Sequence, residues 1–254
     1  MSARGGTFTS SPERLAMLQW LVLMGAVTAE ALAHREGSTL ASARAKLSHA
    51  KRDGLMLAQR PLTDRPTLYT ATAAGVRASG VTGLDACRVS AGGAQHLIAC
   101  AHVAATLERG YPEHSLSGER ELRLREREAG RPLASAVLSR TSNRGRLLHR
   151  PDLVIWPIAG TRGLPLAVEV ELTIKAPRRL AEICRAWARS RHVEGALYIA
   201  PVDVRRALER AILAARASER IAVVPLETMP FSVAARGASA GCCDPAARSV
   251  PSET

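Results

Sequence analysis

The sequence contains no apolar stretch close to the roughly 20 residues that cross a bilayer, so we expect no transmembrane helix. Its first residues, MSARGGTFTSSPER, also lack the apolar core of a signal peptide. We therefore expect a cytoplasmic protein that makes no membrane contact. With 254 residues and 46% hydrophobic content, the chain is globular and has room for one large domain or two smaller ones.

The sequence also lacks any C-x-x-C pair, which argues against a redox motif or a common zinc motif. An odd number of cysteines in a chain that is not exported indicates free thiols. His96 and Cys100 stand at the i, i+4 spacing that can hold zinc on a helix, but no further ligands are evident. A buried helix face explains this pair better. The five cysteines are Cys87, Cys100, Cys184, Cys242 and Cys243.

Lysine is scarce, although the chain is strongly basic. Only Lys46, Lys51 and Lys175 are lysines among 35 basic residues, and the formal net charge is +12. Such a charge favours polyanionic partners such as nucleic acid. An arginine and alanine bias can also reflect the base composition of the coding DNA, so the position of the charge carries more weight than its sum.

The first third of the chain predicts three helices. Residues 12–25 have helical apolar spacing, with proline in the first turn and Gly25 at the end. Thr28 caps a short second helix that Gly37 ends. A third helix starts at Ser38 or Thr39 and runs to about residue 52.

The third helix, residues 39–52, has an apolar stripe and an opposite polar face without acids before Asp53. Cations for phosphates, with hydroxyl and imidazole groups for base edges, are what a reader of the DNA major groove needs. An ordinary solvated helix face explains the pattern equally well. The stripe is Leu40, Ala43, Leu47 and Ala50; the polar face is Ser38, Ser42, Lys46 and His49, flanked by Arg44 and Lys51.

After the third helix, residues 55–59 and 67–72 predict two strands of a hairpin, with Arg60 and Arg65 near its tip. Three helices followed by such a hairpin, and the stretch LYTATAAGVRASG, resemble the winged helix-turn-helix family over residues 12–80. The resemblance implies that the third helix enters the major groove and that Arg60 and Arg65 contact the DNA backbone. Winged helices also serve protein contacts, and that alternative stays open.

Residues 81–94 are small and aperiodic and predict a linker, whereas residues 1–11 and 231–254 predict disordered ends. Between them, residues 95–230 predict a second domain. From residue 166 onward, strands and helices alternate, which favours a parallel or mixed sheet flanked by helices, hence an α/β (α+β) fold. The expected helices are 95–109, 117–128, 178–191 and 202–217; the expected strands are 152–156, 166–174, 196–200 and 221–226; residues 140–150 are expected to form a basic loop.

Three acids stand on strands that otherwise have core character. In LAVEVELTI, Glu169 and Glu171 alternate with apolar residues, and Asp152 begins the preceding strand. Brought together, these carboxylates would form a site for a hard divalent cation such as Mg²⁺. The alternative is an antiparallel pair of strands with one solvated face.

This constellation resembles the PD-(D/E)xK nuclease superfamily, which has the restriction-endonuclease-like fold. Pro151-Asp152 matches its first element, and Glu169-Val170-Glu171 matches the second except that Glu171 replaces the expected lysine. The resemblance implies that Asp152, Glu169 and Glu171 hold the metal, and that Glu119 or Glu121 supplies a further acid. Lys175 is the one candidate for a displaced catalytic lysine, and a bend after the strand would be needed to bring it in.

The order of motifs along the whole chain resembles the replication-relaxation family of plasmid and mobile-element proteins, which implies double-stranded DNA as the partner. Arg178 and Arg179, with the basic stretch 140–150, are candidates for phosphate contacts. Three functions remain open at this point. They are a mobile-element DNA-binding protein whose nuclease-like domain is inactive or of unknown activity, an active metal-dependent endonuclease, and a transcriptional regulator. Homodimerisation is also left open by the sequence.

Overall fold

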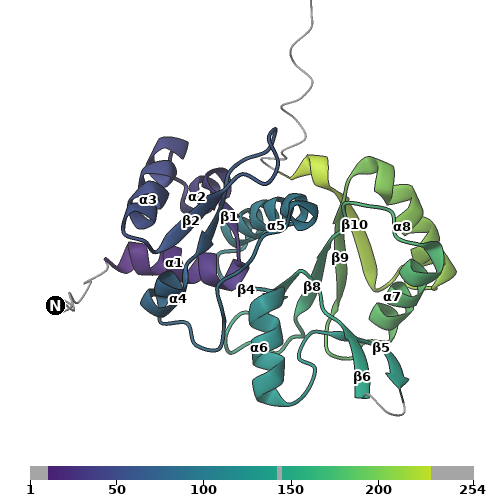
Figure 1. Cartoon of the computed structure of the whole chain (residues 1–254). Coiled ribbons are helices and arrows are strands. Elements are labelled where there is room, and N and C mark those ends of the chain that lie inside the picture. Colours follow the sequence, from purple (N-terminus) through teal and green to yellow (C-terminus); the bar gives the residue numbers. More distant parts are fainter. Residues whose placement is uncertain (1–10, 142–144, 230–254) are drawn as a thin grey trace, which may run out of the picture.

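A computed structural model of the chain, described here for residues 11–141 and 145–229, has a mixed α/β architecture (Figure 1). A five-stranded mixed sheet with helices on both faces forms the second part of the fold, and a helical part with a small sheet precedes it. Within the described residues, no helix has the length and apolar character needed to cross a membrane.

The helices of the first part begin where the sequence predicts. The hydroxyls of Thr28 and Thr39 accept hydrogen bonds from the backbone N–H groups of Ala31 and Ser42, and so cap the second and third helices. In the third helix, Ala43, Leu47 and Ala50 are fully buried, which confirms the predicted apolar stripe. The helices are α1 (Pro12–Met24), α2 (Ala29–Glu36), α3 (Leu40–Arg52) and α4 (Ala73–Ser79).

The predicted hairpin is present as β2 (Met56–Gln59) and β3 (Leu68–Ala71), which pair antiparallel. The short strand β1 (Val27–Thr28) adds to β3, so this small sheet has the order β1-β3-β2. Both residues of β1 are buried, and the strand leads directly into α2.

The main sheet has the strand order β10-β9-β8-β7-β4, which confirms the expected mixed sheet. β8, β9 and β10 run parallel to one another, β7 runs antiparallel to β8, and β4 runs antiparallel to β7. The strands are β4 (Ser115–Gly118), β7 (Leu153–Trp156), β8 (Leu166–Val170), β9 (Gly195–Ala200) and β10 (Ile221–Pro225). The helices of this part are α5 (Ala91–Gly110), α6 (Glu119–Ala129), α7 (Pro177–Arg189) and α8 (Val202–Ala214), followed by the short 3-10 helix Leu226–Thr228.

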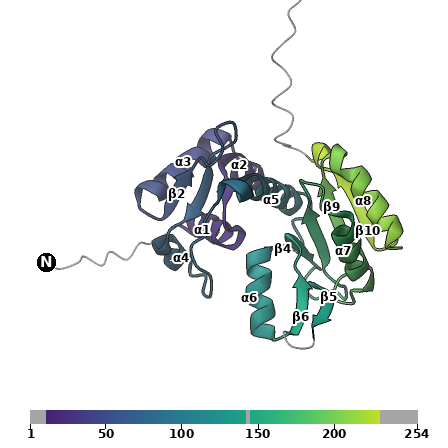
Figure 2. The ribbon, with the colours of Figure 1, turned by 45° about the vertical axis from the view of Figure 1, so that its right-hand side comes forward.

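The two faces of the sheet are covered by different helices (Figures 1 and 2). Val168 and Val170 of β8 belong to the core cluster on the α5 side, whereas Ala167 belongs to the cluster formed with α7 and α8. This alternation places Glu169 on the same face as Ala167, as the sequence pattern predicts. The polar residue is therefore directed toward the α7 side of the sheet.

Helix α5 joins the two parts of the fold. It packs against α2 on one side and against β4 and β8 on the other. One core cluster accordingly contains Leu21 and Leu47 from the first part together with Val103, Leu153 and Val168 from the second. The helix begins at Ala91, inside the stretch that the sequence predicts to be a linker.

Two sequence-based expectations were wrong in this part of the chain. The stretch 140–150 was expected to be a loop, but most of its described residues lie in β5 (Ala136–Thr141) and β6 (Gly145–His149), which pair antiparallel, and β5 packs against α7. The expected strand 166–174 ends at Val170; the N–H of Glu171 still bonds to Ile199 of β9, and residues 172–174 leave the sheet. The predicted disorder of residues 1–11 and 231–254 falls outside the described residues except at Ser11, whose side chain caps α1.

Gly75, near the start of α4, gives a direct test of the packing between α4 and Leu55, the residue before β2. A Cβ at this position would lie 2.0 Å from the carbonyl oxygen of Leu55, and that backbone atom cannot move aside cheaply. We expect Gly75→Ala to lower the free energy of unfolding by about 1–3 kcal/mol, as measured by urea denaturation.

The matched control for this substitution is Gly110→Ala at the end of α5, where a Cβ would meet no atom within 4 Å. Alanine is also the better helix former, so this variant should unfold at the same or a slightly higher urea concentration. Equal stability of the two variants would contradict the close packing of α4 against the backbone of Leu55.

Candidate functional site

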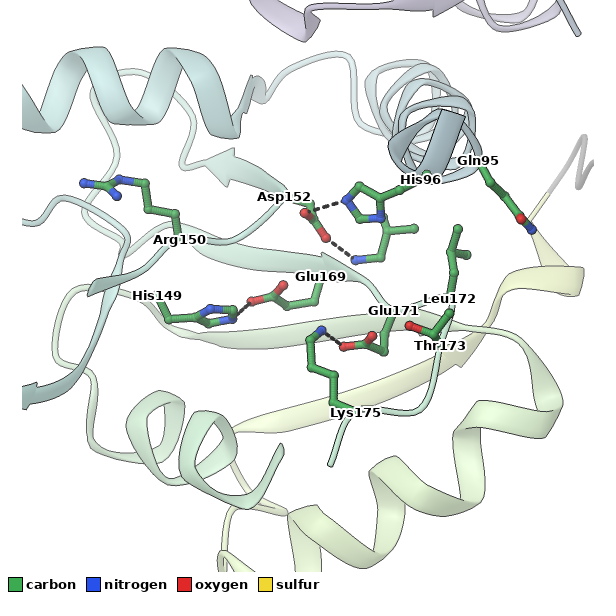
Figure 3. A pocket seen from close by; sticks show the side chains of 12 residues that line it. Gln95, His96, His149, Arg150, Asp152, Glu169, Glu171, Leu172, Thr173 and Lys175 are labelled. Carbon is green, nitrogen blue, oxygen red and sulfur yellow. Dashed lines mark hydrogen bonds and ion pairs between the residues drawn. The ribbon is translucent and has the colours of Figure 1, made fainter. Parts of the chain in front are cut away.

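A pocket of about 390 Å³ opens where the carboxyl end of β8 meets α5 and the chain before β7 (Figure 3). All three acids singled out in the sequence line it. The complete lining is Gly92, Gln95, His96, His149, Arg150, Asp152, Glu169, Val170, Glu171, Leu172, Thr173 and Lys175.

Asp152 lies just before β7 and forms two hydrogen bonds through its carboxylate. One oxygen, Oδ1, lies 2.9 Å from Nε2 of His96 on α5, and the other, Oδ2, accepts from the backbone N–H of Val170 at 2.8 Å. The hydrogen bond to Asp152 raises the pKa of His96 above its ordinary value, and burial opposes this. The carboxylate thus connects α5 to the end of β8.

Glu169 is buried on the α7 side of the sheet, with 5% of its surface exposed. Its Oε1 lies 2.7 Å from Nε2 of His149, the last residue of β6. Burial raises the pKa of Glu169, while the hydrogen bond and charge interaction with His149 act in the opposite direction. The ring of His149 also packs edge-on against Trp187 of α7, with ring centroids 5.7 Å apart, which fixes its position.

Glu171 and Lys175 lie in the segment that leaves the sheet. The backbone N–H of Glu171 still bonds to the carbonyl of Ile199 at 3.0 Å, and the chain then turns away. The turn brings the ammonium group of Lys175 into an ion pair with the buried carboxylate of Glu171. The chain therefore bends after β8, and Lys175 lines the pocket with the three acids (Figure 3).

The three acids share the pocket, but each carboxylate has its own partner, namely His96, His149 or Lys175. Figure 3 shows these pairs side by side along the pocket. Among the described residues, one group of three metal-ligating side chains has all its ligand atoms within 4.8 Å of one another, and it is His96, Cys100 and Asp152. Burial raises the pKa of the Cys100 thiol well above its ordinary value.

Other residues predicted for this site lie outside the pocket lining. The carboxylate of Glu119 pairs with Arg123 one turn along α6, although its backbone N–H donates to the carbonyl of Asp152 at 2.9 Å. Arg178 and Arg179 are exposed in the first turn of α7, and Arg179 pairs with Glu182 at 2.9 Å.

The cations of α3 are less free than the helix sequence indicates. Lys46 pairs with Glu36 of α2 at 2.8 Å, and Arg44 pairs with Glu30 of the same helix at 3.4 Å. The side chain of Lys46 is partly buried, and the hydrogen bond to Glu36 raises its pKa. Acids of α2 thus neutralise part of the positive charge on the polar face of α3.

The solvent-exposed side of α3 differs from the polar face that the sequence predicts for this helix. Ser42 and Lys46 are half-buried at its side, whereas His49 and Lys51 are exposed. Arg60 near the hairpin tip is exposed, and the half-buried Arg65 lies 3.6 Å from Asp64. The exposed positions of α3 are Ala41, Arg44, Ala45, Ser48, His49, Lys51 and Arg52.

Two residues of the pocket, His96 and His149, were missed as parts of the acid site. His149 stands directly before Arg150-Pro151-Asp152, so its position next to the first acid was the available signal. His96 was noted only for its spacing from Cys100, and no sequence feature relates it to Asp152, 56 residues later.

Comparison with protein-family models, with curated proteins and with solved structures finds no match to this chain.

The buried Glu169 predicts a pH dependence of stability. In the folded state the pKa of Glu169 lies above its ordinary value of 4.5, which we take for the unfolded chain. Between the unfolded and folded pKa values, the folded state therefore binds more protons than the unfolded state. Stability should therefore fall as the pH rises from 4.5 through the folded pKa of Glu169. In Glu169→Gln, this fall should be smaller, as measured by urea denaturation at a series of pH values in the presence of a chelator.

The exposed Glu128 of α6 provides the control, because Glu128→Gln removes a carboxyl from solvent and should leave the pH profile of the wild type unchanged. If Glu169→Gln keeps the full pH slope, the burial of this carboxyl is not the source of the dependence.

Proposed function

We propose that this protein binds double-stranded DNA and that its pocket hydrolyses a phosphodiester bond with the help of a divalent cation. The observation that carries the proposal is the position of Lys175, which reaches the same pocket as Asp152, Glu169 and Glu171 although the sequence motif lacks its lysine. An acid before one strand, an acid at the end of the next and a lysine beside them resemble the PD-(D/E)xK arrangement.

The donor chemistry of the pocket suits a hard cation, because carboxylate oxygens are the ligands that Mg²⁺ prefers. To share one ion, the acids would have to leave their present partners His96, His149 and Lys175. Asp152 and Glu169 would hold the ion, with Glu171 nearby. When bound, the ion would orient a water and stabilise negative charge on the phosphate. Lys175 would add positive charge next to Glu171. Nε2 of His149 is held by Glu169, and its ring packs on Trp187, so His149 would position the Glu169 carboxylate.

The first part of the chain supports DNA binding by its arrangement. Three helices and an antiparallel hairpin are what a winged helix-turn-helix consists of, and α3 is the helix that would enter the major groove. Its exposed stripe carries Arg44, Ser48, His49 and Arg52, which can contact phosphates and base edges. The net charge of +12 is in keeping with such a partner.

A role in plasmid replication or in a mobile element rests on the sequence resemblance to the replication-relaxation family. The alternative functions are a protein that holds DNA without cutting it and a transcriptional regulator. They share the DNA-binding part with the proposal and differ from it at the pocket, so the decisive experiment addresses the pocket.

Nicking of supercoiled plasmid in the presence of Mg²⁺ or Mn²⁺ tests the proposed reaction. Asp152→Asn keeps an oxygen for the backbone N–H of Val170 but removes the negative charge, and Lys175→Met removes the ammonium group. Each substitution should reduce the nicking rate by at least about 100-fold, because each removes charge placed where the transition state needs it.

Glu128→Gln is again the control and should nick at the wild-type rate. The folding of each variant is checked by its thermal unfolding. If the wild type binds DNA but never nicks it with either ion, the protein holds DNA without cleaving it, and the nuclease proposal is wrong.

DNA binding by α3 is tested with Arg44→Ala and Lys51→Ala in a mobility-shift titration on a DNA library or genomic fragments. Each cation that contacts a phosphate contributes about one unit to the slope of log K against log salt. Each variant should therefore bind more weakly and show a slope reduced by about one. Arg206→Ala, on the exposed side of α8 away from α3, is the matched control (Figure 1). Equal losses in all three variants would place the DNA contact elsewhere.

A further inference from the structure

One nitrogen atom in the pocket faces two different metal-ligating groups. Nε2 of His96 lies 2.9 Å from Oδ1 of Asp152 and 3.4 Å from Sγ of Cys100. His96 and Cys100 are one turn apart on α5, so their side chains lie on the same side of the helix. Asp152 approaches them from the chain before β7.

These separations are close to those around a tetrahedral zinc ion. Zinc bonds to nitrogen, oxygen and sulfur of about 2.0 to 2.3 Å place neighbouring nitrogen and oxygen ligands about 3.4 Å apart, and nitrogen and sulfur about 3.6 Å apart. The structure has 2.9 Å and 3.4 Å, so movements of a few tenths of an ångström would admit the ion. The carboxylate is held from its other oxygen by the N–H of Val170, which leaves Oδ1 directed at the site.

The ligand types distinguish this site from a magnesium site. A thiolate and an imidazole are soft or borderline ligands that select Zn²⁺ and related ions over Mg²⁺. Three protein ligands with a remaining position open to solvent are the pattern of zinc sites that bind a water or a substrate. His96 and Asp152 both line the pocket, so the fourth position faces it, whereas Cys100 is buried behind them.

We propose that His96, Cys100 and Asp152 bind one Zn²⁺ ion, with the fourth coordination position open to the pocket. The site goes beyond the proposed nuclease function, and its occupation is measured without DNA. Asp152 belongs to both ligand sets, so an ion at this position and a cation on Glu169 would share that carboxylate.

The test is a titration of the metal-free full-length chain with Zn²⁺ against a chromophoric chelator, and with Co²⁺ by absorption. Cys242 and Cys243 are replaced by serine in every sample, because adjacent thiols bind zinc themselves. The chain should bind one equivalent of Zn²⁺, and bound Co²⁺ should show thiolate-to-metal charge transfer. Cys100→Ser and His96→Gln should each weaken Zn²⁺ binding by more than about 100-fold, since they remove direct ligands rather than outer-shell partners.

Cys87→Ser is the matched control, because this half-buried thiol lies outside the site and its loss should leave the affinity unchanged. The Co²⁺ spectrum of the chain with Cys100 intact reports sulfur ligation even if a ligand variant folds poorly. Absence of charge transfer, or equal Zn²⁺ affinity with and without Cys100, would overturn the proposal. Plasmid nicking in Mg²⁺ by a chain that binds no Zn²⁺ would reject this site and leave the nuclease function standing.

Discussion

The shape of the pocket depends on the hydrogen bonds that the Asp152 carboxylate makes. Its two oxygens reach His96 on α5 and the N–H of Val170 at the end of β8, while its backbone carbonyl accepts from the N–H of Glu119 at the start of α6. One residue therefore positions two helices and a strand relative to one another. Loss of the Asp152 charge would change the chemistry of the pocket. Loss of the whole side chain would also break the hydrogen bonds that hold α5 and the end of β8 together.

The surrounding acids follow the rule that buried charge needs a partner. Glu169 and Glu171, each 5% exposed, are matched by His149 and Lys175. Glu126 is buried in α6 and accepts from the N–H groups of Leu133, Ala134 and Ser135 as well as from Arg150. That interaction fixes the chain that leads into the β5–β6 hairpin, and the hairpin in turn delivers His149.

Local signals in the sequence predicted much of the fold. The hydroxyls of Thr28 and Thr39 mark helix starts because a cap acts within four residues, and the alternation in β8 gives its two faces correctly. The strands β5 and β6 were missed because their arginines and glycine are not typical of strands. These strands form because they pair with each other and because β5 packs on α7. The turn after Val170 and the partners of the α3 cations depend on distant segments, which no local pattern contains.

Helix α5 determines how the first and second parts of the fold are positioned relative to each other. Its buried apolar residues from Ala99 to Leu107 belong to one core cluster with residues of α1, α2 and β8, so the packing of the two parts is continuous at this helix. Under the proposed function, a duplex bound by α3 would therefore meet the pocket at a fixed distance. The cleaved phosphate would then lie a constant number of base pairs from the bound sequence.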